Sequence, residues 1–127
     1  KENTDYTITS DSIPLGTGTE VVKIKALKKI AETTTEPKYR EHVTTWFHDN
    51  PTLMSQSHVP APAYLMNKSH RLTVDTRNDL TLMEKIFDEF YSLASPLLDL
   101  EKVIHFLDTR PDVSQINADT PQKNWQS

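Results

Sequence analysis

The sequence contains no cysteine and only two glycines, Gly16 and Gly18. The absence of cysteine excludes disulfides, cysteine-ligated zinc and thiol catalysis. The familiar phosphate-binding loops need glycines at set places between a strand and a helix, and two glycines cannot build either kind. Any nucleotide site would therefore need residues from elsewhere.

The chain also has no basic excess and no long apolar run. It carries 14 basic and 18 acidic residues, for a net charge of -4, which argues against gripping nucleic acid through phosphates. No apolar stretch approaches the length of a membrane span, and the amino terminus shows no signal-peptide pattern. These features predict a cytoplasmic protein without nucleic-acid or membrane partners.

The length of 127 residues with 35% hydrophobic content suits one modest core, so residues 1–127 are expected to form a single domain or a fragment of one. A strand pattern at residues 5–9 starts close to the first residue, which suggests a piece of a larger sheet. Residues 117–127 are polar apart from Trp125, and we expect this tail to fray.

The hydrophobic pattern predicts an α/β fold with about four helices and short, partly mixed strands. Turn-forming residues predict a loop over residues 11–19. Strands are expected at residues 5–9, at 20–23, where a helix lead-in is the alternative, and at the proline-flanked edge segment 64–66. Helices are expected at residues 24–33, 37–48, 77–94 and 99–110.

Each predicted helix has an expected buried face. Lysines at 25, 28 and 29 form the solvated face of helix 24–33, and Trp46 and Phe47 are expected in the core or an interface. The broad apolar face of helix 77–94 consists of Leu80, Met83, Phe87, Phe90 and Tyr91, with Ile86 and Leu93 flanking it. The last helix, capped by Asp99, is expected to bury Leu100, Val103, Ile104 and Leu107.

The run from His70 to Thr76 is β-type, ends on Asp75 and passes into the helix at residue 77. An acid at the carboxyl end of a strand in an open α/β sheet is well placed to hold metals and phosphates. The alternative is that Asp75 only caps the helix, as most acids at such junctions do. Thr76 with Asp79 forms a variant capping box, which leaves Asp75 available for another task.

Four motifs together resemble a known family. They are Arg40-Glu41-His42-Val43-Thr44, Asn50-Pro51, Arg71-Leu72-Thr73-Val74-Asp75-Thr76 with Asp79-Leu80, and Leu100-Glu101-Lys102-Val103-Ile104. Their order and spacing resemble the C-terminal half of the spore coat polysaccharide biosynthesis protein F group. That group is similar to the cytidylyltransferases that activate KDO and sialic acid, with the nucleotide-diphospho-sugar transferase fold. The resemblance covers residues 5–117 and leaves the family's amino-terminal half unaccounted for.

This resemblance implies transfer of CMP from CTP to a sugar, with release of pyrophosphate. It makes Asp75 a metal contact, with Mg²⁺ as the expected cofactor. Phosphoryl transfer needs a hard cation held by one or two carboxylates, with water completing its shell. In the family the nucleotide loop lies in the amino-terminal half, so the chain as given is expected not to catalyse by itself.

The resemblance also marks substrate-binding candidates. The family's sugar-side loop corresponds to residues 14–21, where Pro14, Gly16 and Glu20 match. Leu15 and Gly18 replace acids, which implies a different sugar or altered activity.

Arg40 is favoured as an anion contact, because its fork matches carboxylate and phosphate. Glu41 and His42 are candidates too. A surface ion pair and a half-buried histidine are the alternative, since Arg40 and His42 lie on different helix faces.

A second class of function is a non-catalytic dimerisation or interaction module of the same fold. Related enzymes form dimers through this half, and the segment 51–66 has edge-strand character and exposed apolar residues. A homodimer is therefore expected. A metal-dependent hydrolase is the weaker reading, because no second carboxylate stands at a bridging spacing from Asp75.

Overall fold

The computed structural model describes residues 3–9 and 12–121. The contacts divide these residues into two compact units. The first unit comprises residues 3–9 and 19–60, and the second comprises 12–18 and 61–121. Each unit has its own hydrophobic cluster.

The first unit is built on a mixed three-stranded sheet in the order β2-β1-β3. Its strands are β1 (Tyr6–Thr9), β2 (Glu20–Val22) and β3 (Gln56–Val59). The central strand β1 pairs antiparallel with β2 and parallel with β3, so that Tyr6 stands opposite both Val22 and Gln56. The strands predicted near residues 5–9 and 20–23 are confirmed.

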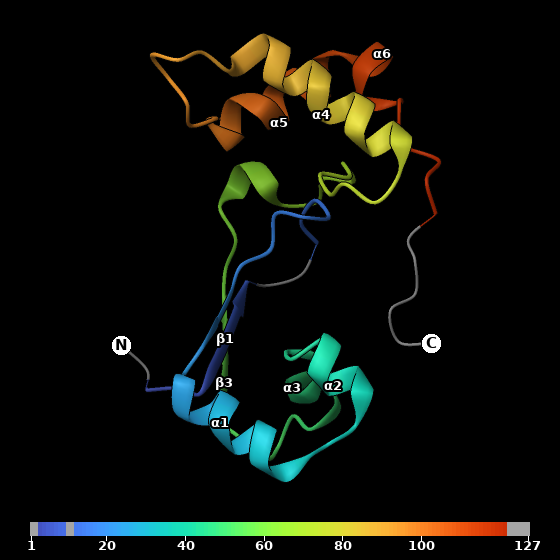
Figure 1. Ribbon diagram of the computed structural model, residues 1–127. Coiled ribbons are helices and arrows are strands. Elements are labelled where there is room, and N and C mark those ends of the chain that lie inside the picture. Colours follow the sequence, from blue (N-terminus) through green and yellow to red (C-terminus); the bar gives the residue numbers. More distant parts are fainter. Residues whose placement is uncertain (1–2, 10–11, 122–127) are drawn as a thin grey trace. The chain divides into compact units, whose positions relative to one another are not determined.

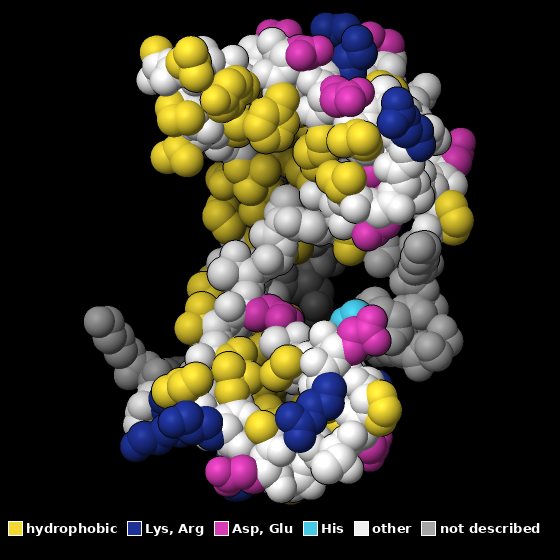
Figure 2. All heavy atoms as spheres, in the orientation of Figure 1, with side chains coloured by type: hydrophobic (Ala, Val, Ile, Leu, Met, Phe, Trp, Pro, Cys, Tyr) yellow, Lys and Arg dark blue, Asp and Glu magenta, His cyan; other side chains and the backbone are white. Residues whose placement is uncertain are grey.

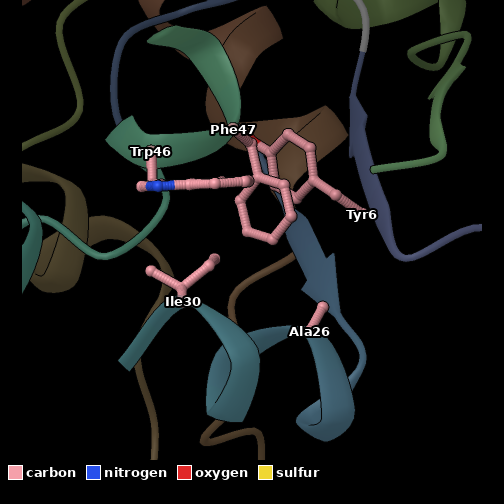
Figure 3. Packing of buried hydrophobic residues seen from close by; sticks show 5 residues of the cluster. All are labelled: Tyr6, Ala26, Ile30, Trp46 and Phe47. Atoms are coloured by element: carbon pink, nitrogen blue, oxygen red, sulfur yellow. The ribbon is translucent and has the colours of Figure 1, made fainter. Parts of the chain in front are cut away.

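Three helices accompany this sheet: α1 (Ile24–Thr33), α2 (Pro37–Glu41) and α3 (Thr45–Asp49) (Figure 1). Their apolar residues meet β1 in one cluster, which Figure 3 shows from close by. Within it the Tyr6 ring stacks on Phe47 at 4.4 Å between centroids, and Trp46 meets Phe47 edge to face at 5.7 Å. The expectation that Trp46 and Phe47 belong to the core is confirmed, and Lys25, Lys28 and Lys29 are exposed as predicted.

Two predictions for residues 37–66 are wrong. The helix expected over 37–48 is two short helices, because the backbone leaves helical geometry at His42, with φ -120° and ψ 77°. The break lets the consecutive residues Thr45, Trp46 and Phe47 all reach the interior.

The edge strand expected at 64–66 is a 3₁₀ turn, η1 (Ala63–Leu65), which begins after Pro62 and buries Leu65. The strand of this region is β3, which ends at Val59, before Pro60 and Pro62.

The second unit is helical. It contains η1, α4 (Arg77–Phe90), α5 (Leu100–Thr109) and α6 (Pro111–Ser114). One cluster from the three α-helices forms its core, consisting of Leu82, Ile86, Val103, Leu107 and Val113. The Asp99 cap of α5 and its end at Arg110-Pro111 are confirmed, as is the burial of Val103, Ile104 and Leu107. Leu100 is only partly buried.

The apolar face predicted for α4 is confirmed only in part, since Met83 and Phe90 pack against the core cluster that contains the flanking Ile86. The helix ends at Phe90 rather than Ala94. Leu80, Phe87 and Tyr91 are 37%, 48% and 46% exposed, while Leu82 and Ile86 are buried together with Asp79. The helix is turned so that Asp79 points inward, and positions three and seven residues later follow it. Figure 2 shows hydrophobic side chains gathered over the loop between α4 and α5, where Leu93 and Leu97 are exposed.

The segment expected to fray, which starts at residue 117, begins with a buried residue. Asn117, placed by sequence at the start of a fraying tail, is only 2% exposed and forms hydrogen bonds to Arg71 and Asp79. Residues 122–127, including Trp125, lie outside the described residues. Within the described ranges no helix has the length and apolar character needed to cross a bilayer.

Candidate functional site around Arg71 and Asp75

The segment 70–76 is not the strand that the sequence predicts. It forms one isolated parallel bridge, between Leu15 and Arg71. The Leu15 amide donates to the His70 carbonyl at 3.1 Å, and the Leu72 amide donates to the Leu15 carbonyl at 2.7 Å. The segment leading into Asp75 is therefore held by the loop that contains Gly16.

Gly16 is required by this contact. Its φ is +91°, and a Cβ built on it would lie 2.3 Å from the Leu72 carbonyl oxygen. No other residue fits so close to the backbone without displacing it. Gly16 thus acts by letting the two segments approach.

The segment is also attached to α5. Asp108 accepts hydrogen bonds from Lys68 Nζ at 2.5 Å and from His70 Nε2 at 2.9 Å. These contacts, that of Lys68 foremost, lower the pKa of Asp108. The residues around Arg71 are therefore held by two parts of the unit: His70 and Leu72 by the loop of Gly16, and Lys68 and His70 by α5.

Arg71 and Asp79 form a buried ion pair at the start of α4. Arg71 Nε donates to Asp79 Oδ1 at 2.8 Å, and the two side chains are 8% and 0% exposed. The pair is completed by Asn117, whose Nδ2 donates to Asp79 Oδ1 at 2.7 Å and to the Arg71 carbonyl at 3.0 Å. A carboxylate without exposure needs such partners to stay charged.

Asp79 is also the acid of the capping box predicted from the sequence. Its Oδ2 accepts from the amides of Asp75 and Thr76 at 3.1 and 2.9 Å, and its own amide donates to Thr76 Oγ1 at 3.3 Å. The Arg71 guanidinium, foremost, and the Asn117 amide hold the pKa of Asp79 well below its usual range, against the opposing effect of burial. The capping box is confirmed, and it is one side of a larger polar network.

Asp75 lies at the exposed edge of this network. Its side chain is 41% exposed. Arg71 Nη2 donates to Asp75 Oδ2 at 2.6 Å, and Thr73 Oγ1 donates to the same oxygen at 3.2 Å. Helix capping is performed by Thr76 and Asp79, so Asp75 does not serve as the cap.

Asp75 is the residue at this site that can serve as a ligand to a magnesium ion. In the described ranges no three His, Asp or Glu side chains gather into a group that could hold a metal. The oxygens of Asp79 are occupied by the buried network, which leaves Asp75 as the accessible carboxylate. Mg²⁺ commonly takes one or two carboxylates and fills its remaining positions with water and phosphate oxygens, and Asp75 fits that pattern.

The remaining candidates lie in the first unit. Glu20 Oε1 accepts a hydrogen bond of 2.6 Å from the Tyr6 hydroxyl, which also lies 3.3 Å from His48 Nε2. Burial and the adjacent Glu20 raise the pKa of Tyr6. Glu20 therefore supports the hydroxyl of a core tyrosine, while its own side chain stays 33% exposed.

Arg40, Glu41 and His42 are all on the surface. Arg40 Nη2 donates to the Ala31 carbonyl at 3.2 Å, and its side chain borders a small pocket between α1 and α2 of about 150 Å³. Glu41 and His42 are 79% and 43% exposed, with 3.8 Å between Glu41 Oε1 and His42 Nε2.

The structure places Gly16 and Asp75 in the second unit and Glu20, Arg40, Glu41 and His42 in the first. Sequence reasoning missed Arg71 and Asn117 as members of the polar network. Arg71 belongs to the motif that leads to Asp75, and the capping box indicates Asp79. Nothing in the pattern around Asn117 signals its burial.

Comparisons with known proteins agree with this fold. No family model matches the chain. An uncharacterised protein of Methanocaldococcus jannaschii, MJ1063, is 34% identical over 125 residues, which are 98% of this chain and 50% of that protein. The chain thus spans about half the length of the curated relative it matches.

A solved structure extends the comparison. The cytidylyltransferase from Leptospira borgpetersenii serovar Hardjo-bovis matches with a TM-score of 0.76 at 18% identity, over 94% of this chain and 48% of that one. The predicted fold class is confirmed: the chain is mixed α/β and corresponds to the C-terminal half of a cytidylyltransferase-like fold.

Proposed function

We propose that this chain is the sugar-side and metal-side part of a cytidylyltransferase, which transfers CMP from CTP to a sugar and releases pyrophosphate. The observation that carries the proposal is the likeness in fold to a cytidylyltransferase, over 94% of the chain. The motif resemblance to the spore coat polysaccharide group supports a sugar destined for a cell-surface polysaccharide. The acidic sugars that related enzymes activate are the first substrates to examine.

Asp75 is the residue proposed to contact Mg²⁺. The support is chemical: it is an accessible carboxylate at the start of a long helix, and it is not used for capping. When bound, the cation neutralises charge on the phosphate oxygens during transfer. Asp75 would offer the cation one carboxylate oxygen, and phosphate and water oxygens would complete its coordination.

Candidate sugar contacts are proposed in each unit taken by itself, Gly16 in the second unit and Glu20 and Arg40 in the first. Gly16 fixes the backbone next to Leu72, while Glu20 and Arg40 offer a hydrogen-bond acceptor and an anion contact on the surface. Glu41 and His42 remain candidates for the same substrate. The nucleotide is proposed to bind a portion of the protein outside these 127 residues. The reasons are that the chain spans about half the length of MJ1063 and of the Leptospira cytidylyltransferase, and that it has only two glycines.

The test is pyrophosphate release that depends on CTP and Mg²⁺. It should be measured for the full gene product and for the 127-residue chain, with KDO, sialic acid and neutral sugars, and with UTP, ATP and GTP as competing nucleotides. We expect activity in the full gene product only. Asp75→Asn should remove most of it without unfolding the protein, while Asp88→Asn, which changes an exposed acid on α4, should leave it intact. Normal turnover in the Asp75 variant would contradict the metal contact.

A second candidate function is a non-catalytic interaction module. The strand β3 is an edge of the three-stranded sheet, and Val59 on it is 51% exposed. An exposed edge can pair with another chain, and a second copy would give the expected homodimer. Light scattering of the purified chain, with Val59→Lys as the disrupting variant, tests this; a wild-type monomer at high concentration would contradict it.

A further inference from the structure

We propose that Arg71 is a positioning residue for Asp75. It is shared between the buried carboxylate of Asp79 and the exposed carboxylate of Asp75. The inference rests on the proposed function, since it concerns how Asp75 meets a cation. It assigns Arg71 the task of holding that carboxylate by one oxygen, so that a cation contacts the other.

The Arg71 side chain is held in place by the buried carboxylate of Asp79. Its Nε is held by Asp79 at 2.8 Å, and its backbone carbonyl accepts from Asn117 while its neighbours pair with Leu15. With the guanidinium plane fixed by a buried partner, the direction in which Nη2 points is also fixed. Arginine can do this because its donors lie in one rigid fork.

The same guanidinium reaches outward to Asp75. The two hydrogen bonds that described residues donate to the Asp75 carboxylate, from Arg71 Nη2 and Thr73 Oγ1, both go to Oδ2. The side chain is 41% exposed. Oδ1 is therefore the oxygen available to a ligand, and the carboxylate is restrained from chelating a cation with both oxygens.

Two consequences follow for cation binding. A single oxygen of a carboxylate already paired with Arg71 attracts a free divalent cation weakly, because the positive charge beside it opposes the approach. Phosphate oxygens on the cation supply the missing ligands. The arrangement thus favours a cation that arrives on a phosphate-bearing substrate over a free one.

The first experiment reads the geometry without any metal. NMR of the arginine side chains follows the Nε and Nη protons of Arg71 in the 127-residue chain and in Asp75→Asn. Arg71 Nη2 also lies 3.3 Å from Asp79 Oδ2, a longer contact than its 2.6 Å bond to Asp75. We therefore expect the Nη2 signals to shift and exchange faster in the variant, while the Nε signal, held by Asp79 at 2.8 Å, stays in place. Unchanged Nη signals in the folded variant would overturn the proposal.

The second experiment uses Mn²⁺ alone as the probe, through paramagnetic broadening of backbone amides. In the wild-type chain we expect weak broadening centred on residues 73–76. Arg71→Lys keeps a cation for Asp79 but cannot hold Asp75 as well, so the affinity for Mn²⁺ should rise about threefold, the order of one exposed ion pair. Equal affinity in folded Arg71→Lys would also overturn the proposal.

The controls separate this inference from the proposed function. Asp75→Asn should abolish the broadening, and Asp88→Asn should not change it. If broadening at residues 73–76 is the same in Asp75→Asn, the metal contact of the proposed function is wrong, and the arginine signals still decide whether Arg71 positions Asp75. Should Arg71→Lys not fold, that same readout on Asp75→Asn suffices.

Discussion

Arg71 and Asp79, eight residues apart, form a buried ion pair with 2.8 Å between Nε and Oδ1. This contact joins three features that the sequence presents separately: the motif that leads to Asp75, the capping box of α4 and the segment after α6. Because Asp79 is fully buried, the face of α4 that carries Asp79 is the face toward the interior, and Leu82 and Ile86 on that face are buried with it.

Asp79→Asn is expected to destabilise the protein by about 3 kcal/mol, because it leaves the Arg71 guanidinium in a buried position without its main partner. Urea unfolding followed by circular dichroism measures this loss. Asp88→Asn, on an exposed position of the same helix, is the matched control and should change the free energy of unfolding by less than about 0.5 kcal/mol. Equal stabilities of the two variants would contradict a buried charged pair.

The same pair predicts a dependence of stability on pH. Because Arg71 lowers the pKa of Asp79 in the folded state, its contribution is fully present above the unfolded pKa of about 4 and is lost as the pH falls through the folded value. The difference in unfolding free energy between wild type and Asp79→Asn should therefore be constant from about pH 7 to about pH 5 and shrink below about pH 4. Asp5, Asp49, Asp108 and Asp112, whose pKa values are also lowered, occur in both proteins, so their direct effects cancel in the comparison. A difference that stays constant down to about pH 2 would contradict the prediction.

Local patterns predicted the elements that local interactions determine. The helix at residues 24–33, the Asp99 cap and the Thr76–Asp79 capping box follow from spacing and cap residues, and all three are found. The fold class also followed, from motifs spread over the chain. These features depend on residues close in sequence or on a resemblance that spans most of it.

Long-range contacts account for the errors. The most apolar stripe of α4 predicts one buried face, but Asp79 is held in the interior by Arg71 and by Asn117, 38 residues later. The segment 70–76 has strand composition, yet its partner is a single residue of the loop, Leu15. The break near His42 accompanies the burial of the three consecutive residues Thr45, Trp46 and Phe47, of which Trp46 and Phe47 share a cluster with Tyr6, and no periodicity shows this.

Tyr6→Phe is expected to destabilise the first unit by about 1 kcal/mol, the usual net contribution of a hydrogen bond. The substitution removes the 2.6 Å bond to Glu20 and retains the ring that stacks on Phe47. Thermal unfolding measures the change. Phe47→Leu is the comparison for lost ring packing and should cost more. Unchanged stability in Tyr6→Phe would show that the hydrogen bond between the hydroxyl and Glu20 does not stabilise the unit.

Gly16→Ala is expected to destabilise the second unit and to shift the amide signals of residues 70–76. The physical cause is twofold: a φ of +91° that side chains rarely adopt, and a Cβ placed 2.3 Å from the Leu72 carbonyl oxygen. The cost should be about 2 kcal/mol, in the range for strained backbone. Gly18→Ala is the matched control in the same loop, because its Cβ would meet only the Ile13 side chain at 3.8 Å. Gly16 allows the contact between Leu15 and the segment around Arg71, so its substitution should also weaken the Arg71–Asp75 pair. The readout is faster exchange of the Arg71 Nη protons. Gly18→Ala should leave that exchange unchanged. Identical stabilities and spectra for the two variants would show that the close approach of the loop to Leu72 does not hold the segment in place.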